Sequence, residues 1–257
     1  TIVDFDALSA AEGKNWVYKG ATCLPPHETR CLISLSDGGK DAVTVREFDR
    51  TTQTFVADGF VLPESKGGAS WIDADTLLVS RDFGPGTLTS SGYPMIVKRL
   101  RRGQTLDQAE TLFTGQPTDV SVSGYTLRDA DGVIQATLIN RGVSFYEGET
   151  WRLNADGTTT QLALPAKSDI EALVQGQLVV TTKQDWTAPS GQEFRTGDVF
   201  AWNLDAWLAD PATPARLIIR PGPREAIEGI SATRNRLVVA LFENVRGGVY
   251  VYEPNAD

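Results

Sequence analysis

The sequence predicts an all-β fold, a β-propeller with five recognisable four-stranded blade repeats. Short apolar or β-branched runs recur as second-strand cores, and their starts lie about 45, 59, 43 and 59 residues apart. A repeat of this size cannot bury its own apolar face, so neighbouring repeats must stack or close into a ring. The five cores are Cys31–Ser36, Thr76–Ser80, Gln135–Ile139, Leu178–Thr182 and Leu237–Leu241.

Further predicted strands flank each core, because β-branched runs alternate with turn residues on both sides. The first strands are expected at Gly20–Cys23, Ala69–Ile72, Gly124–Leu127, Ile170–Leu173 and Ile227–Ile230. The third strands are expected at Val43–Phe48, Pro94–Arg99, Thr150–Leu153, Val199–Trp202 and Gly248–Tyr252. The fourth strands are expected at Thr54–Val56, Glu110–Phe113, Thr160–Leu164 and Arg216–Ile219.

The two ends of the chain and one inner link need separate treatment. The fifth repeat stops before a fourth strand, so we expect Thr1–Ala10 or another stray strand to pair with it. Asp205–Asp210 could form a helical turn. No break in composition divides the chain, so residues 1–257 are interpreted as one propeller domain or a fragment of one.

Charge and composition exclude several classes of partner. The net charge of -9 and the isoelectric point of about 4.7 disfavour binding to the nucleic-acid backbone. No apolar stretch approaches the roughly 18 residues that span a bilayer, so no membrane partner is expected. Thr1 is not an initiator methionine, and the start is interpreted as a cut within a longer protein. The compartment stays open between cytoplasm and periplasm.

Cys23 and Cys31 are the only cysteines, near facing ends of adjacent strands. A disulfide between them is geometrically conceivable, but two reduced core residues are the favoured interpretation.

Catalytic and metal-binding patterns are absent from the sequence. No Gly-x-Ser-x-Gly elbow occurs, and the only histidine, His27, lies in a Pro-rich turn. One histidine and two cysteines do not make a zinc site, and no calcium loop is present. Asp129–Gly132 is a turn signal. We therefore predict no catalytic residue, no metal site and no cofactor in this chain.

A basic run and three tryptophans are more simply explained by the fold than by function. The basic run Lys98–Arg102 is expected to be a solvated strand edge. Trp71, Trp151 and Trp202 fall within predicted strands and are expected in the core.

The links from second to third strands are rich in glycine, aromatic and charged residues. Loops of this kind on a rigid scaffold often form binding surfaces, although ordinary long loops are an equal alternative. Phe83, Arg141 and Trp186 are candidate substrate-facing residues, chosen from loop position and side-chain chemistry alone.

Several ordered motifs resemble prolyl oligopeptidase-type serine peptidases. They are Asp37-Gly38-Gly39 before Val43–Asp49, Ala69–Asp73 with Thr76–Ser80 and Gly92-Tyr93-Pro94, Asp185-Trp186 with Thr196-Gly197-Asp198, and Glu243–Gly247. The resemblance runs from about Asn15 to Pro254. It implies a seven-bladed propeller that caps an α/β-hydrolase domain carrying serine, aspartate and histidine, and that admits only short peptides for cleavage after proline. This chain has five recognisable repeats and lacks the hydrolase domain.

The leading hypothesis is therefore a non-catalytic gating propeller whose partners are the hydrolase domain of the same parent chain and short peptides. A stand-alone propeller that binds a protein or peptide through its loop face is the first alternative. A metal-dependent propeller enzyme such as a lactonase is the second, because carboxylates are abundant.

Overall fold

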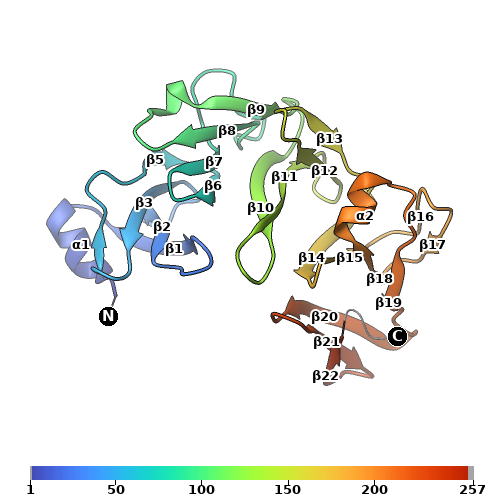
Figure 1. Ribbon diagram of the computed structural model, residues 1–257. Coiled ribbons are helices and arrows are strands. Elements are labelled where there is room, and N and C mark those ends of the chain that lie inside the picture. Colours follow the sequence, from blue (N-terminus) through green and yellow to red (C-terminus); the bar gives the residue numbers. More distant parts are fainter. Residues whose placement is uncertain (1, 254–257) are drawn as a thin grey trace. The chain divides into compact units, whose positions relative to one another are not determined.

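The computed structural model describes residues 2–253 as a succession of antiparallel sheets (Figure 1). Contacts divide the chain into two compact units. Unit 1 contains Thr1–Thr126, Ala136–Phe145 and Trp151–Thr160. Unit 2 contains Leu127–Gln135, Tyr146–Thr150 and Gln161–Asp257.

Five sheets follow one another in the predicted order. The first contains β1 (Trp16–Cys23), β2 (Arg30–Asp37), β3 (Val43–Asp49) and β4 (Thr54–Phe55), with β5 (Val61–Ser65) also paired to β3. The second contains β6 (Gly68–Asp73), β7 (Thr76–Ser80), β8 (Ile96–Arg101) and β9 (Glu110–Thr114). The third contains β10 (Ser121–Arg128), β11 (Ile134–Gly142), β12 (Gly148–Leu153) and β13 (Thr159–Gln161).

The remaining strands belong to unit 2. The fourth sheet contains β14 (Ser168–Val174), β15 (Gln177–Thr182), β18 (Val199–Asn203) and β19 (Arg216–Ile219). The fifth contains β20 (Glu225–Ala232), β21 (Leu237–Glu243) and β22 (Arg246–Tyr252). A two-stranded hairpin, β16 (Trp186–Thr187) and β17 (Glu193–Phe194), extends from the link between β15 and β18.

All five second-strand cores are confirmed, as β2, β7, β11, β15 and β21. The four strands predicted for each of the first four repeats are present, and the first sheet gains β5. The fifth has three strands within residues 2–253, which agrees with the fourth strand missing from its sequence, so five four-stranded repeats are not confirmed. Three of the sheets have four strands each.

A β-bulge recurs in the first strand of four sheets. The pairing with the second strand shifts register between Tyr18 and Gly20, Trp71 and Asp73, Ile170 and Ala172, and Ile227 and Gly229. Each shift places one extra residue in the first strand, which bends the strand and increases its twist.

The N-terminal segment is a helix, so its expected pairing with the last sheet is wrong. Helix α1 (Phe5–Glu12) begins where Asp4 Oδ1 accepts a hydrogen bond from the Ala7 amide at 2.9 Å, and Gly13 ends it at φ 63°. Phe5 and Leu8 pack against the apolar cluster of the first sheet, with Val3 beside them. The helical turn expected near residue 205 is confirmed as α2 (Leu204–Ala209), and a 3₁₀ turn, η1, spans Leu106–Gln108.

Tryptophan side chains anchor the core of each unit. Trp71 is buried between the first and second sheets and donates its indole N–H to the Thr22 carbonyl at 2.9 Å. Trp202 is buried in unit 2, where its ring stacks on Trp207. Trp151 is half-buried against Phe113. The three tryptophans predicted for the core therefore pack there, Trp151 less completely than the others.

One buried carboxylate joins the first two sheets. The Glu47 side chain is fully buried and accepts hydrogen bonds from Arg30 Nη1 at 3.0 Å, from Arg102 at 2.8 and 3.2 Å, and from the Phe60 amide at 2.9 Å. Arg102 Nε also pairs with Asp75 at 2.8 Å. The basic run is therefore more than a solvated edge, because Arg102 neutralises a carboxylate from the neighbouring sheet.

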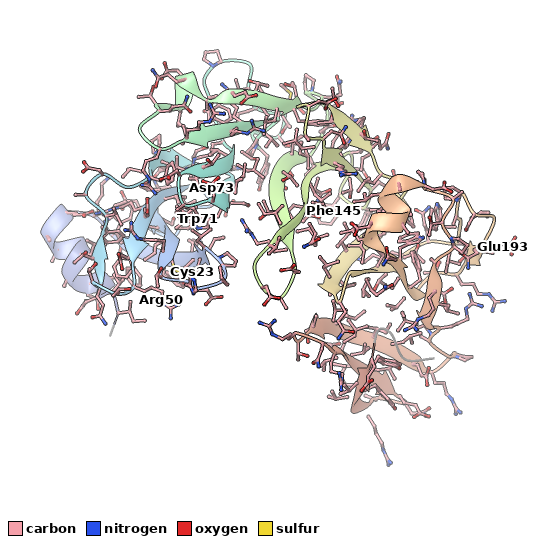
Figure 2. All side chains as sticks on the ribbon, in the orientation of Figure 1. Cys23, Arg50, Trp71, Asp73, Phe145 and Glu193 are labelled. Carbon is pink, nitrogen blue, oxygen red and sulfur yellow. A yellow bond between two sulfur atoms is a disulfide. The ribbon has the colours of Figure 1, made fainter. Side chains whose placement is uncertain are left out.

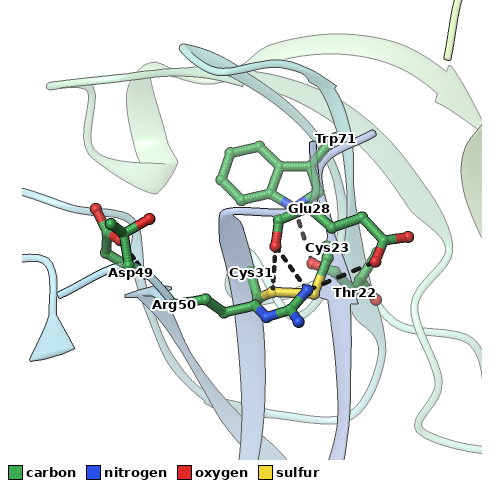
Figure 3. The surroundings of a disulfide bond; sticks show 8 residues. Thr22, Cys23, Glu28, Cys31, Asp49, Arg50 and Trp71 are labelled. Atoms are coloured by element: carbon green, nitrogen blue, oxygen red, sulfur yellow. Dashed lines mark hydrogen bonds and ion pairs between the residues drawn. A yellow bond between two sulfur atoms is a disulfide. The ribbon is translucent and has the colours of Figure 1, made fainter. Parts of the chain in front are cut away.

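Cys23 and Cys31 form a disulfide, which corrects the expectation of two reduced thiols (Figure 3). The residues are direct partners of β1 and β2, with Cα atoms 3.9 Å apart. Antiparallel partners of this kind approach most closely at positions that exchange no backbone hydrogen bonds. The hydrogen bond from Leu24 N to Arg30 O places the cysteines at such a position.

Removing this disulfide should destabilise unit 1. The bond spans a sequence separation of 8 residues, for which chain entropy predicts a loss of about 2–3 kcal/mol in the free energy of unfolding. Urea unfolding of the Cys23→Ala/Cys31→Ala variant should show that loss. Dithiothreitol should lower the wild-type midpoint to the level of the variant and leave the variant unchanged. A wild-type midpoint that does not respond to complete reduction would contradict the prediction.

Candidate functional site: the loops after the second strands

Arg81 and Phe83 occupy the loop between β7 and β8, and both face inward. Arg81 is completely buried, and Nη2 donates to the carbonyl oxygens of Val43 and Pro63 at 2.5 Å each. No carboxylate pairs with Arg81 within residues 2–253, and burial lowers its pKa to about 10. Phe83 is half-buried against the core, and Lys98 Nζ lies 4.5 Å from its ring centroid. Phe83 therefore supports this loop.

Arg141 lies at the end of β11 and forms a two-point ion pair with Asp119. Its Nε and Nη2 donate to the two carboxylate oxygens at 2.8 and 3.0 Å. Asp119 is 2% exposed, and its Oδ2 also accepts from the Gln116 amide at 2.6 Å. Burial opposes the charge, but the hydrogen bonds from Arg141 and Gln116 outweigh it and lower the pKa of Asp119. The Arg141 guanidinium thus fixes the turn before β10.

Trp186 begins the β16–β17 hairpin and is held by an aromatic cluster. Its ring stacks on Phe194 and Phe200 at centroid distances of 6.0 Å each and meets Trp202 edge-on at 6.3 Å. Asp185 fixes the base of the hairpin, because its Oδ1 accepts from the Thr196 amide at 2.8 Å. Trp186 is therefore rigid and half-buried.

A mostly polar hollow of about 410 Å³ lies against this hairpin. Its walls include Trp186, Asp185, Glu193, Arg195 and Arg220; Figure 2 labels Glu193. Trp186 is the one sequence-predicted candidate in its lining, so the three candidates have separate local settings.

An ion pair between Arg220 and Asp198 holds one wall of the hollow, and the sequence did not predict it. Arg220 Nε and Nη2 donate to the two oxygens of Asp198 at 2.9 and 2.6 Å, and Asp198 is 1% exposed. Burial again opposes the charge, whereas hydrogen bonds from Arg220 and the Arg195 amide lower the pKa of Asp198. The partners lie 22 residues apart, so no local pattern joins them.

Other loop tips are strongly exposed. Phe145 and Tyr146, between β11 and β12, are 84% and 76% exposed. Figure 2 labels Phe145. Val245, at the β21–β22 turn, is 91% exposed and has φ 67°, which is unusual for a β-branched residue. These tips place apolar groups in solvent.

A second hollow, of about 460 Å³, lies on the first sheet beside the disulfide and is lined mainly by apolar side chains. Its one charged lining residue, Arg50, already donates to the Glu28 carbonyl at 2.9 Å (Figure 3). The hollow therefore offers little to orient a polar ligand.

Two turns singled out in the sequence are present in the structure. His27 is exposed in its Pro-rich turn, and Asp129–Gly132 forms a turn in which the Gly132 amide donates to the Asp129 carbonyl.

In the described part of the chain, no group of three or more histidine, cysteine, aspartate or glutamate residues could hold a metal ion. The same part contains no helix long and apolar enough to cross a membrane.

The sheets and their loops match a known family over the whole chain. Residues 1–257 match the family described as "Prolyl oligopeptidase, N-terminal beta-propeller domain". The chain belongs to this family. The resemblance seen in the sequence motifs is thereby confirmed.

Individual relatives agree with this assignment. The chain is 43% identical over 257 residues to a protein described as the uncharacterized peptidase y4nA of Sinorhizobium fredii, covering 98% of this chain and 35% of that protein. A solved post-proline cleaving enzyme from Rickettsia typhi has a TM-score of 0.90 and 25% identity, covering 98% of this chain and 38% of that one. Oligopeptidase B from Leishmania major shares the fold, with a TM-score of 0.69 and 17% identity over 99% of this chain and 33% of that one. The chain thus spans about a third of the length of these relatives.

Proposed function

We propose that this prolyl oligopeptidase-family propeller is a non-catalytic gate that restricts peptide access to an α/β-hydrolase active site elsewhere in a longer parent protein. The match of all 257 residues to the propeller domain of a peptidase family carries the proposal. Residues 1–257 then act as one domain, and a catalytic domain of the same parent chain and short peptides are its partners.

The local structure suits a gate. In unit 1, hydrogen bonds from the buried Arg81 hold the loop after β7, and the Arg141–Asp119 ion pair holds the loop after β11. In unit 2, the Arg220–Asp198 ion pair and the packing of Trp186 on Phe200 hold the loop after β15. Stiff loops suit a filter that excludes folded proteins by size and lets short peptides pass. Phe83, Arg141 and Trp186 each contribute by stiffening their own loop.

Peptidase assays test this role. The purified chain should not hydrolyse a proline-containing p-nitroanilide peptide, whereas the full-length parent should, with sensitivity to a serine-directed inhibitor. Deleting the propeller from the parent should increase cleavage of a large unfolded protein relative to the short peptide, because the size filter is gone. Inhibitor-sensitive turnover by the isolated chain would overturn the non-catalytic assignment. An unchanged size preference after deletion would overturn gating.

A stand-alone propeller that binds a protein through its loop face is the second candidate. The exposed side chains of Phe145 and Tyr146 favour it, since exposed aromatic groups are common at protein interfaces. The parent reading frame separates the candidates. A downstream hydrolase domain with a Gly-x-Ser-x-Gly elbow contradicts the stand-alone function.

A further inference from the structure

The hollow beside the β16–β17 hairpin combines features that no gating function requires. Arg195 and Arg220 line the same space, which has a volume of about 410 Å³. That volume lies within the range of small-ligand sites, which use a few fixed polar groups to orient a ligand.

Arg220 is held rigidly in this hollow. Asp198 accepts hydrogen bonds from Arg220 Nε and Nη2, and the side chain of Asp198 is buried. Nη1 of Arg220 has no protein partner in the described chain, and the Arg220 side chain is 37% exposed. The arginine therefore presents a donor to the hollow at a fixed position, without the entropic cost of ordering a long side chain.

Arg195 supplies a second positive charge. It is exposed, and within residues 2–253 its guanidinium forms no ion pair with a carboxylate. Its own amide is fixed by Asp198 Oδ2 at 2.8 Å, so the backbone that carries it is anchored. Asp185 and Asp198 attract the Arg195 guanidinium and offset its repulsion from Arg220, so both cations can line the same hollow.

The surrounding carboxylates limit the charge of that anion. Asp185 and Glu193 line the same hollow, and Asp198 lies behind Arg220. Hydrogen bonds from the amide and hydroxyl of Thr196 lower the pKa of Asp185, which keeps it ionised at neutral pH. Two arginines against three carboxylates leave no excess positive charge. This arrangement disfavours a doubly charged phosphate more strongly than a singly charged carboxylate, whose binding must come from hydrogen bonds to the guanidinium groups. A planar carboxylate also matches the fork of a guanidinium.

Trp186 forms an apolar wall of the hollow. Its ring is immobilised by Phe194 and Phe200, so it offers a fixed surface for an aliphatic or aromatic group next to the bound anion. A peptide carries such a group beside a carboxylate. We propose that the hollow lined by Arg195, Arg220 and Trp186 binds a peptide carboxylate, independently of peptide cleavage.

Binding to the intact 257-residue chain tests the site. Calorimetric titration with N-acetyl-Ala-Pro-Leu should show saturable binding at one site, and the C-terminally amidated peptide should bind about tenfold more weakly or worse. N-acetyl-Ala-Pro-Glu-amide distinguishes the source of the carboxylate: binding comparable to the free acid assigns side-chain carboxylates as ligands too, and weak binding restricts the site to C-termini. Inorganic phosphate should compete poorly.

The Arg195→Gln variant should weaken binding of the free acid by about tenfold, and Arg195→Lys should restore part of it. Arg195 is used because replacing Arg220 would leave Asp198 buried and unpaired. Arg224→Gln, at another exposed arginine of unit 2, is the matched control and should leave binding unchanged. Equal affinity for acid and amide, or unchanged binding by folded Arg195→Gln protein, would overturn the proposal. Neither result bears on gating, which the peptidase assays test separately.

Discussion

Replacing Glu47 by alanine should lower the free energy of unfolding by about 3 kcal/mol. Its buried carboxylate pairs with Arg30 and Arg102 and accepts the Phe60 amide, so its removal takes one of two carboxylate partners from each arginine and leaves a buried N–H without its acceptor. Both arginines are partly exposed, which puts the loss near the lower end of the range for buried ion pairs. Urea unfolding followed by circular dichroism measures it.

Glu110→Ala is the matched control. Glu110 pairs with Arg99 at 3.1 Å in the second sheet, but its side chain is 54% exposed, so the loss should be below about 1 kcal/mol. Equal losses for the two variants would show that the burial of Glu47 does not matter.

The contribution of Glu47 should also depend on pH. Burial alone raises the pKa of this carboxyl, but hydrogen bonds from Arg102, Phe60 and Arg30 lower it below its ordinary value. The unfolded chain therefore binds a proton more readily than the folded one. The stabilisation is complete above about pH 4.3, the ordinary glutamate pKa, and is lost as the pH falls through the lower folded value. The stability difference between wild type and Glu47→Gln should shrink over that acidic interval, and a constant difference would contradict the shift.

Replacing Gly67 by alanine should cost about 2–5 kcal/mol, as the sum of left-handed backbone strain and overpacking. Gly67 lies in the link between β5 and β6 at φ 96°. A Cβ there would collide with the carbonyl oxygen of Ser80 and lie 2.5 Å from Pro94 Cγ. Ser80 belongs to β7, so the backbone cannot yield without disturbing the second sheet. Loss of soluble folded protein, or a large fall in the melting temperature, is the expected measurement.

Gly86→Ala separates strain from collision. Gly86 also has positive φ, at 80°, but an added Cβ would meet no atom within 4 Å. Its cost should be the backbone term alone, about 1–2 kcal/mol. If Gly67→Ala costs no more than Gly86→Ala, the close approach to Ser80 is not what requires glycine.

The sequence predicted the second strands well because their signal is local. Leu178–Thr182, for example, is a buried run that ends at turn residues on both sides. The elements that were not predicted either had a weak sequence pattern or had a pattern that was misinterpreted. β5 contains Pro63 and pairs with β3, the strand that also pairs with β4. β16 and β17 have two residues each. Helix α1 carried a readable signal, Asp4 before the helix and Gly13 after it, in a segment interpreted as a stray strand.

The candidate site was harder to predict because its residues meet through the fold. Trp186 was predicted as a substrate-facing residue from its loop position, and it lines a hollow, but its packing on Phe194 and Phe200 depends on a hairpin and on β18. Arg220 and Asp198 lie 22 residues apart, and Arg102 and Glu47 lie 55 apart. Arg141 looked like a free guanidinium in the sequence, whereas the structure commits it to Asp119. The role of a charged loop residue therefore cannot be predicted until its ion-pair partner in the fold is known.

The recurring bulge in the first strands bears on how such repeats should be compared. The residues at the four register shifts are Lys19, Ile72, Glu171 and Glu228, which share no side-chain chemistry. What recurs is a backbone irregularity, so alignment by residue identity will miss the structural correspondence of these repeats. Superposing the repeats on the bulge gives their residues a common reference position. A chimaera that exchanges strands between repeats should keep each first strand, with its bulge, together with the second strand that it pairs with.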